Sequence, residues 1–277
     1  MSLVNGAERM NTTKRIGIVA GAALLLSALP VTLQAAKPAA VAPAEAQSPA
    51  VDAEAVAALE RMGAALRALK QFTLASEAST EVVLDNGQKI ELDSQLKYQV
   101  QPPRHLFVDI ESARAHRQLF YDGNTMTLYS PRLKYYASVD GVNATLGELA
   151  GKLWNNYGID LPLADLFQWG SATAPRPTLI SANHIGAGSV DGTPVEQYAF
   201  QQTDVDWQLW IGKSDNLPRK IVIISQDDPA QPAYTARLKW DVRAPIASTA
   251  YTFTPPKDAA RIGILVVDAV AMQPEGK

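Results

Sequence analysis

The sequence predicts a mainly β protein with some helix: a single, strongly curved antiparallel sheet of about nine to eleven strands, which is an incomplete β barrel. An N-terminal helix and a mid-chain helical lid are expected to cover this sheet. Apolar and polar residues alternate over most of the chain after residue 72, and turn signals separate these runs at short spacing. Two other stretches instead repeat apolar residues at three- and four-residue steps, which is the period of a helix.

The start of the chain is typical of an export signal. Lys14 and Arg15 precede the uncharged run 16–36, so residues 1–36 are predicted to be a secretory signal peptide that directs the protein to the periplasm. The alternative is an uncleaved inner-membrane anchor, because the run can nearly span a bilayer. Residues 37–51 are mostly alanine and proline and are expected to be a disordered leader.

The first helix is predicted from about Ala53 to Lys70. Asp52 can cap its N-terminus, and Glu54 in the first turn suits the helix dipole. A single apolar stripe indicates that the helix packs on another element; its residues are Val56, Leu59, Met62, Leu66 and Leu69.

A meander of strands follows. The triplet 85–87, Asp-Asn-Gly, predicts a hairpin turn into a strand that runs to Val100 and ends before Pro102. Leu106 begins the next apolar face, and the triplet 122–124, Asp-Gly-Asn, turns the chain again. Sequential strands are therefore expected to be neighbours in the sheet.

The meander is interrupted over residues 145–170. Thr145 and Glu148 have the spacing of a capping box, and a helical stripe follows them, namely Leu146, Leu149, Leu153 and Trp154. Pro162 is expected to start a second short helix. This helical pair is predicted to cover the open face of the sheet.

Strands resume after the helical pair and complete one domain. The alternation is clearest in 234–242, where Tyr, Ala, Leu, Trp and Val occupy every second position. The domain is expected to span residues 52–256. Residues 257–277 would be a C-terminal extension, in which Ile262–Val267 either adds a strand or trails.

Composition excludes several classes of function. The chain has 277 residues, no cysteine and three histidines, so disulfides and thiolate metal sites are excluded, and no histidine has metal-ligand spacing. A net charge of −3 gives no electrostatic reason to bind nucleic acid. The glycine-rich stretch 186–192 fits a hairpin turn better than a dinucleotide loop. We therefore predict no enzyme activity, no cofactor and no metal.

Three segments resemble the periplasmic lipoprotein-carrier (LolA/LolB-like) superfamily, and most closely an uncharacterised group of predicted periplasmic proteins related to it. They are Gln101–Leu106 (QPPRHL), Tyr121–Pro131 (YDGNTMTLYSP) and Tyr251–Pro256 (YTFTPP). The stretch Tyr157–Trp169 is similar to a signature of the uncharacterised group. The resemblance implies a hydrophobic cavity that takes acyl chains beneath a helical lid.

The carriers tether the lid by an arginine directly before the strand-ending proline. Here Pro102 stands at that position, so lid latching and lipoprotein handover are not carried over.

Taken together, these patterns predict a non-enzymatic periplasmic protein that binds a lipid or a lipoprotein acyl chain in an apolar cavity. The alternative is an envelope interaction or sensing module whose apolar cleft binds a protein segment. The expected partners are a lipid or an acylated protein, and in the alternative an envelope protein, with at most transient membrane contact. The candidate ligand-binding residues could equally be ordinary core; they are Leu96, Tyr98, Leu106, Val108, Phe120, Met126, Leu128, Trp154, Phe167, Trp207 and Leu209.

Overall fold

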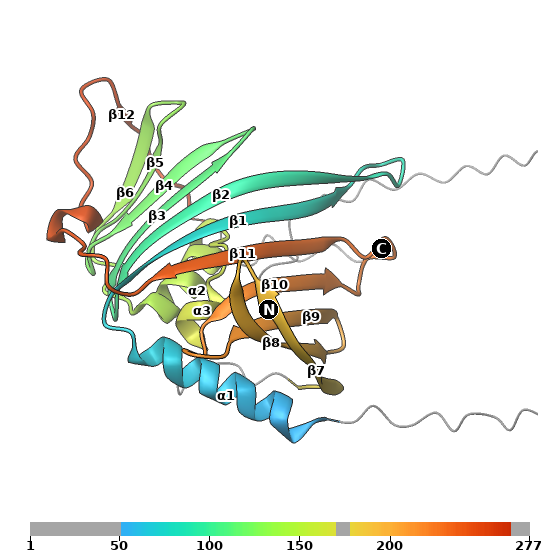
Figure 1. Cartoon of the computed structure of the whole chain (residues 1–277). Coiled ribbons are helices and arrows are strands. Elements are labelled where there is room, and N and C mark those ends of the chain that lie inside the picture. Colours follow the sequence, from blue (N-terminus) through green and yellow to red (C-terminus); the bar gives the residue numbers. More distant parts are fainter. Residues whose placement is uncertain (1–50, 170–177, 267–277) are drawn as a thin grey trace, which may run out of the picture. The chain divides into compact units, whose positions relative to one another are not determined.

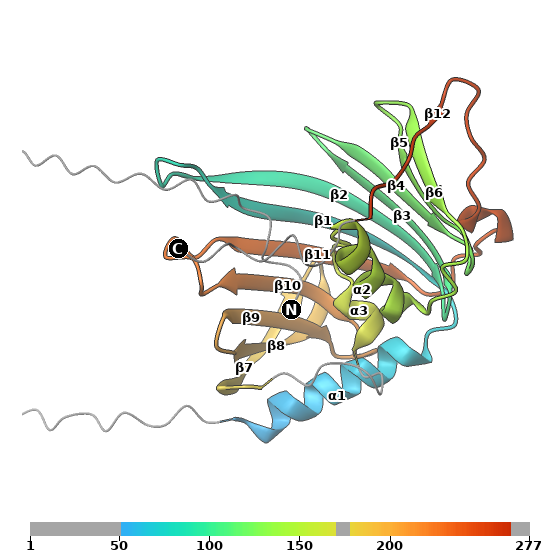
Figure 2. The same ribbon diagram turned by 180° about the vertical axis from the view of Figure 1, so that it is seen from behind.

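The computed structural model describes residues 51–169 and 178–266, and it contains one twelve-stranded sheet with helices packed on one of its faces (Figures 1 and 2). The predicted signal peptide, nearly all of the predicted leader and the last part of the predicted C-terminal extension lie outside the described residues.

Helix α1 spans Ala53–Ala68 and begins as predicted, because the Asp52 carboxylate accepts a hydrogen bond from the Glu54 amide at 2.8 Å. It ends two residues before the predicted Lys70. The helix lies beside one edge of the sheet, where the Asp52 amide donates to the carbonyl of Ala182 at 2.9 Å.

The first half of the sheet is a meander of antiparallel strands, each paired with the next along the chain. Gly87, at φ 80°, forms the predicted first hairpin turn, in a backbone region that glycine adopts readily. The strands are β1 (Phe72–Val83), β2 (Lys89–Gln101), β3 (His105–Ser112), β4 (His116–Tyr121), β5 (Met126–Ser130) and β6 (Tyr135–Val139).

The second half is a second meander that is joined to the first by pairing of β11 with β1. The resulting order, β12-β6-β5-β4-β3-β2-β1-β11-β10-β9-β8-β7, is open at both ends, so the sheet is not closed into a barrel. The strands are β7 (Ser181–Val190), β8 (Thr193–Gln201), β9 (Val205–Gly212), β10 (Pro218–Ser225) and β11 (Ala233–Asp241).

The twelfth strand is the main departure from the predicted strand count. β12 (Ala260–Arg261) is a two-residue strand that pairs in parallel with β6, and the described part of Ile262–Val267 adds no strand. A short 3₁₀ helix, η1 (Ser248–Tyr251), precedes it.

Two mid-chain helices interrupt the meander, as predicted. Helix α2 spans Leu146–Tyr157 and has the predicted capping box between Thr145 and Glu148. Helix α3 spans Asp165–Gln168 and begins three residues after Pro162, because hydrogen-bonded turns first connect Leu161 to Ala164 and Leu163 to Leu166. Figure 2 shows both helices on the same side of the sheet. The face that they cover is called the covered face below, and residues 144–169 are called the cover.

Candidate functional site

Strand register makes the covered face continuously apolar. Tyr98 on β2 lies opposite Leu74 on β1 and Val108 on β3, and the next pair along β2 and β3 is Leu96 with Ile110. Because successive strand residues point to opposite sides, each such row adds apolar side chains to the same face. Buried aliphatic and aromatic side chains therefore form one core cluster that extends across the sheet from β5 to β7.

The cover is attached firmly at its N-terminal end. The Tyr121 hydroxyl donates to the carbonyl of Ala144 at 2.6 Å and accepts from the Ala144 amide at 2.7 Å. The Leu146 amide donates to the carbonyl of Pro103 at 2.9 Å. These bonds fix the start of α2 to the sheet near the β2–β3 turn.

The far end of the cover is attached mainly by apolar contact. Among the described residues, the Tyr98 hydroxyl donates to the carbonyl of Pro162 at 2.5 Å. The ring of Phe167 lies 6.2 Å from that of Tyr98, and Trp169 lies 5.7 Å from Trp207. Burial of leucines supplies the rest; these are Leu161, Leu163 and Leu166.

Leu163 carries an unusual backbone conformation. Its φ is 59°, in the left-handed region that a leucine rarely adopts, although its side chain is buried. A non-glycine residue in this region costs roughly 1–3 kcal/mol and persists where the surroundings hold it in place. Burial of the Leu163 side chain is therefore offset in part by strain in the same segment.

Polar groups are also present in the apolar interior and at its border. Burial strongly raises the pKa of the Tyr98 phenol, and burial and the nearby Asp160 carboxylate together raise the pKa of Tyr234. Desolvation of the carboxyl group raises the pKa of Asp160 to about 6, with a smaller contribution from Asp165, although residue 160 as a whole is exposed. The hydroxyls of Tyr234 and Ser76 are buried without a hydrogen-bond partner among the described residues.

Most of the predicted ligand-binding residues lie together in this region. On the sheet the structure places eight of them on the covered face, and Phe167 of α3 packs against the same core cluster. The eight are Leu96, Tyr98, Leu106, Val108, Met126, Leu128, Trp207 and Leu209.

Phe120 lies on the opposite face. Its neighbours Leu119 and Tyr121 are buried under the cover, so strand alternation directs Phe120 outward, where its ring lies 4.9 Å from Phe107 and 5.2 Å from Phe253. The run 119–121 is apolar on both faces, which is why its alternation does not show the direction of Phe120.

Trp154 is half-buried and lies outside the core cluster. The buried residues of α2 are Leu146, Leu149 and Leu153, and the next position along a helix is rotated by about 100° from Leu153. Trp154 is therefore not brought together with the other candidates.

Sequence reasoning missed the polar residues of the interior. The alternation in β11 does place Tyr234 on the apolar face, but nothing in that pattern indicates an unpartnered hydroxyl. Asp160 lies in a segment between two helices and is exposed, and nothing in the sequence indicates that its carboxylate acts on Tyr234.

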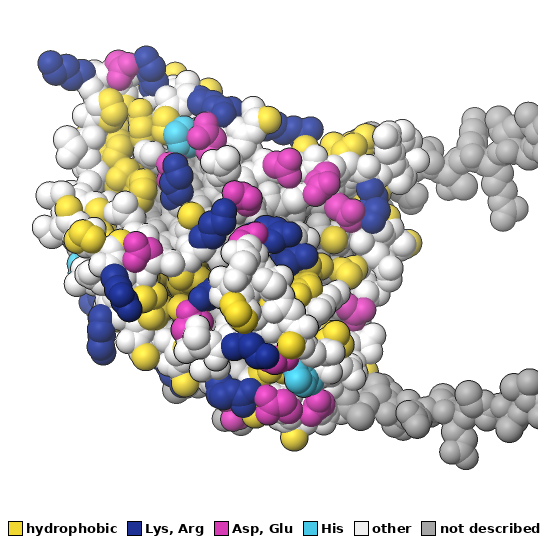
Figure 3. Space-filling view, in the orientation of Figure 1, with side chains coloured by type: hydrophobic (Ala, Val, Ile, Leu, Met, Phe, Trp, Pro, Cys, Tyr) yellow, Lys and Arg dark blue, Asp and Glu magenta, His cyan; other side chains and the backbone are white. Residues whose placement is uncertain are grey.

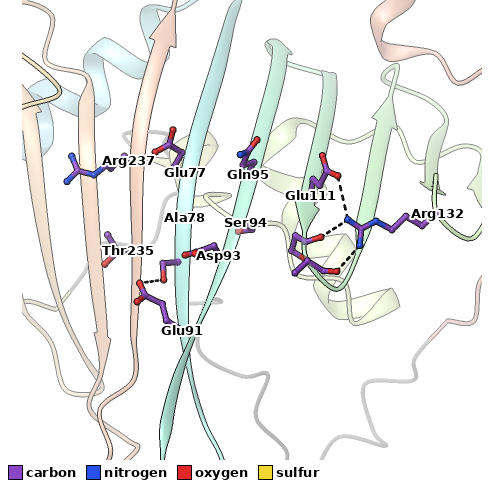
Figure 4. A pocket seen from close by; sticks show the side chains of 13 residues that line it. Glu77, Ala78, Glu91, Asp93, Ser94, Gln95, Glu111, Arg132, Thr235 and Arg237 are labelled. Carbon is purple, nitrogen blue, oxygen red and sulfur yellow. Dashed lines mark hydrogen bonds and ion pairs between the residues drawn. The ribbon is translucent and has the colours of Figure 1, made fainter.

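Two cavities open on the outer face, opposite the cover. The larger, of about 770 Å³, is a polar trough across β1, β2 and β11, with Glu77, Gln95 and Arg237 beside it (Figure 4). Charged side chains also gather over these strands in the space-filling view (Figure 3). The smaller, of about 270 Å³, lies near Phe120 and Phe253. Neither lies between the sheet and the cover.

Within the described residues no cluster of histidine, aspartate and glutamate is suited to hold a metal ion. In the same part of the chain, no helix is both long and apolar enough to cross a bilayer. The covered face therefore offers apolar burial and a few hydrogen-bonding groups as its chemistry.

The fold is similar to several solved structures of low sequence identity. LprF from Mycobacterium bovis is 17% identical, with a TM-score of 0.43, and the match covers 77% of this chain and 100% of that one. A LolA superfamily protein from Nitrosomonas europaea is 12% identical, with a TM-score of 0.35 over 72% and 97% of the two chains. MucB, in its complex with MucA from Pseudomonas aeruginosa, is 16% identical, with a TM-score of 0.39; the match covers 72% of this chain and 60% of MucB.

These similarities concern the fold alone. No curated protein matches the sequence. A family model described as "Predicted periplasmic protein (DUF2092)" matches residues 55–265, from the first helix to just beyond the last strand. The chain therefore belongs to the DUF2092 family of predicted periplasmic proteins.

Proposed function

We propose that this protein is a non-enzymatic periplasmic binding protein that holds the acyl chain of a lipid or lipoprotein between the covered face and the cover. Residues 1–36 serve as its export signal. The supporting observation is the unequal attachment of the cover, which hydrogen bonds fix at Ala144–Leu146 whereas mainly apolar contacts hold it near Leu163. Apolar contacts are non-directional, so an acyl chain can replace them at little cost when the far end of the cover lifts.

Binding is driven by burial of apolar surface, at roughly 25 cal/mol per Å². The leucines of the cover already fill the covered face, so the ligand competes with the protein's own side chains. The observed affinity is then reduced by the cost of opening, as for any protein whose binding-competent state is a minor one.

The direct test is extraction of lipid from the exported protein, followed by mass spectrometry, together with uptake of the apolar dye N-phenyl-1-naphthylamine. We expect copurifying acyl lipid and saturable dye uptake. A folded protein that carries no acyl lipid and takes up no dye would contradict the proposal.

A pair of variants relates the uptake to the covered face. Phe167→Glu places a charge against Tyr98 and is expected to reduce dye uptake at least tenfold, because the charge must be desolvated in the apolar interior. Leu133→Glu is the matched control, because Leu133 is 68% exposed, and it is expected to keep wild-type uptake. Equal uptake by the two folded variants would exclude the covered face as the binding site.

A second candidate function, capture of an extended protein segment, is favoured by the edge strand β7. Its first half is partly covered through the bridge between Val51 and Ala182, whereas Ile185 farther along is 55% exposed. Exposed edge strands recruit partner strands by main-chain hydrogen bonding. Ile185→Lys should weaken pull-down of an envelope protein if this edge is used, and it should leave dye uptake unchanged.

A further inference from the structure

The covered face has a low row of small side chains at the centre of the sheet. Ala78 on β1 pairs with Ser94 on β2 and with Ala236 on β11, so three adjacent strands present small residues side by side. Ala78 and Ala236 are both buried. Within an apolar core of leucines and aromatic rings, this row presents shorter side chains than the rows on either side of it.

Unpartnered hydroxyls border this row on both sides. Ser76 lies one row before it and Tyr234, paired with Thr80, lies one row after it, and both side chains point to the covered face. Neither hydroxyl has a hydrogen-bond partner among the described residues, although both are buried. A buried hydroxyl without a partner costs roughly 1–3 kcal/mol, and a ligand that brings a hydrogen-bond acceptor into the apolar core cluster recovers that cost.

The hydroxyl of Tyr234 is also within electrostatic range of Asp160 in the cover. The Asp160 carboxylate acts electrostatically on both Tyr234 and Tyr98, and the Tyr98 hydroxyl is already committed to the carbonyl of Pro162. Of the two phenols, Tyr234 is therefore the one with a hydrogen to donate. The Asp160 carboxylate, which acts on this hydroxyl, is ionised at pH 7.5 and repels an anionic head group, so a neutral acceptor is favoured.

We infer that Tyr234 is the head-group anchor of this site, donating its hydroxyl hydrogen to the carbonyl oxygen of a neutral acyl ester whose carbon chain lies along the covered face over Ala78 and Ala236. This inference rests on the proposed function and adds the class of ligand, an esterified rather than a free fatty acid.

The test compares Tyr234→Phe with wild type at pH 7.5, using displacement of N-phenyl-1-naphthylamine by monopalmitoylglycerol, by palmitate and by hexadecane. The wild type is expected to bind monopalmitoylglycerol more tightly than palmitate. Tyr234→Phe should weaken monopalmitoylglycerol binding about fivefold to tenfold, the effect of one neutral hydrogen bond. It should leave the dye and hexadecane within twofold of wild type.

Tyr251→Phe is the matched control, because the Tyr251 hydroxyl is also buried without a described partner but its residue belongs to η1, outside the core cluster. It should leave the affinities for the dye, monopalmitoylglycerol, palmitate and hexadecane unchanged.

A synthetic diacylglyceryl-cysteine peptide tested beside monopalmitoylglycerol distinguishes a protein-borne ester from a free lipid. Tighter binding of either one supports the inference.

Three results would overturn the assignment of Tyr234: equal loss in both tyrosine variants, no loss in Tyr234→Phe, or palmitate binding as tightly as the ester in wild type. In each of these cases the dye still binds, so the proposed function stands. Absence of dye and lipid binding in wild type would instead remove the proposed function itself.

Discussion

Tyr121 is the residue that connects the sheet to the cover. Its buried hydroxyl bonds to both the amide and the carbonyl of Ala144, the residue just before the α2 N-cap. The side chain lies at the end of β4, where the sequence pattern indicates only that an aromatic residue belongs to the hydrophobic core. Its hydrogen bonds join residues 23 positions apart, and no local pattern of residues predicts them.

Tyr121→Phe is expected to lower the free energy of unfolding by about 1–3 kcal/mol, because it leaves the buried amide and carbonyl of Ala144 without partners. Urea denaturation measures the change. Tyr251→Phe removes a buried hydroxyl that has no described partner, so it should not lower the free energy of unfolding. Similar losses in the two variants would show that Tyr121 has no special role.

Asp160 should make stability depend on pH. Its pKa is raised to about 6 in the folded protein, so the folded state binds more protons than the unfolded state between about pH 4 and pH 6. The free energy of unfolding attributable to this group therefore falls as pH rises through that window and is constant above it. After desolvation, the groups that act on it are the Asp165 carboxylate, which raises its pKa, and a backbone hydrogen bond from Leu161, which lowers it.

Comparison of Asp160→Asn with wild type across pH 4 to 7 isolates this effect. The difference in stability between the two proteins is expected to shift in favour of the asparagine variant as pH rises. The shift should stay below about 1 kcal/mol, because Asp160 keeps solvent contact. A difference that is constant with pH would show that the Asp160 carboxyl titrates normally.

At the scale of elements, α2 is the part of the fold whose stability should be separable from the rest. Its capping box is exposed and local, with the Glu148 amide bonded to the Thr145 hydroxyl and the Thr145 amide to the Glu148 carboxylate. The sheet, by contrast, is held by ladders of hydrogen bonds between neighbouring strands.

Thr145→Ala is therefore expected to destabilise α2 locally by about 1 kcal/mol. Hydrogen exchange followed by mass spectrometry should show faster exchange in residues 146–157 and unchanged exchange in β1 and β2. Dye uptake should also become faster if opening of the cover limits it. Equal acceleration in the helix and the strands would mean that the cover does not open independently.

Elements with a strong local pattern were predicted well. Caps at Asp52 and Thr145 and the hairpin turn at residues 85–87 all lie where expected, because each depends on residues a few positions apart. The pairing of β1 with β11 had no such signal, since Leu74 and its partner Trp240 are far apart in the chain. The same reason explains the missed site residues: Tyr234 and Asp160 approach each other only through the tertiary fold.

At the scale of the whole molecule, ligand binding should show the signature of apolar burial. Isothermal titration calorimetry with monopalmitoylglycerol at several temperatures should give a negative heat-capacity change. Because the cover's leucines already occupy the face, part of the buried area is exchanged rather than gained, and the change should be smaller than the ligand's own apolar area predicts. A value near zero would favour surface binding.

The seam between β1 and β11 also has a consequence for biogenesis. A chain that appears N-terminus first presents β1 and its partner β2 almost together, whereas β11 follows roughly 150 residues later. We therefore expect the edge of β1 that pairs with β11 to stay unpaired while the first six strands form. The second meander can pair with it only when synthesis or transport is nearly finished. A chaperone that binds unfolded chains would find an exposed target at this unpaired edge, which includes Ala78.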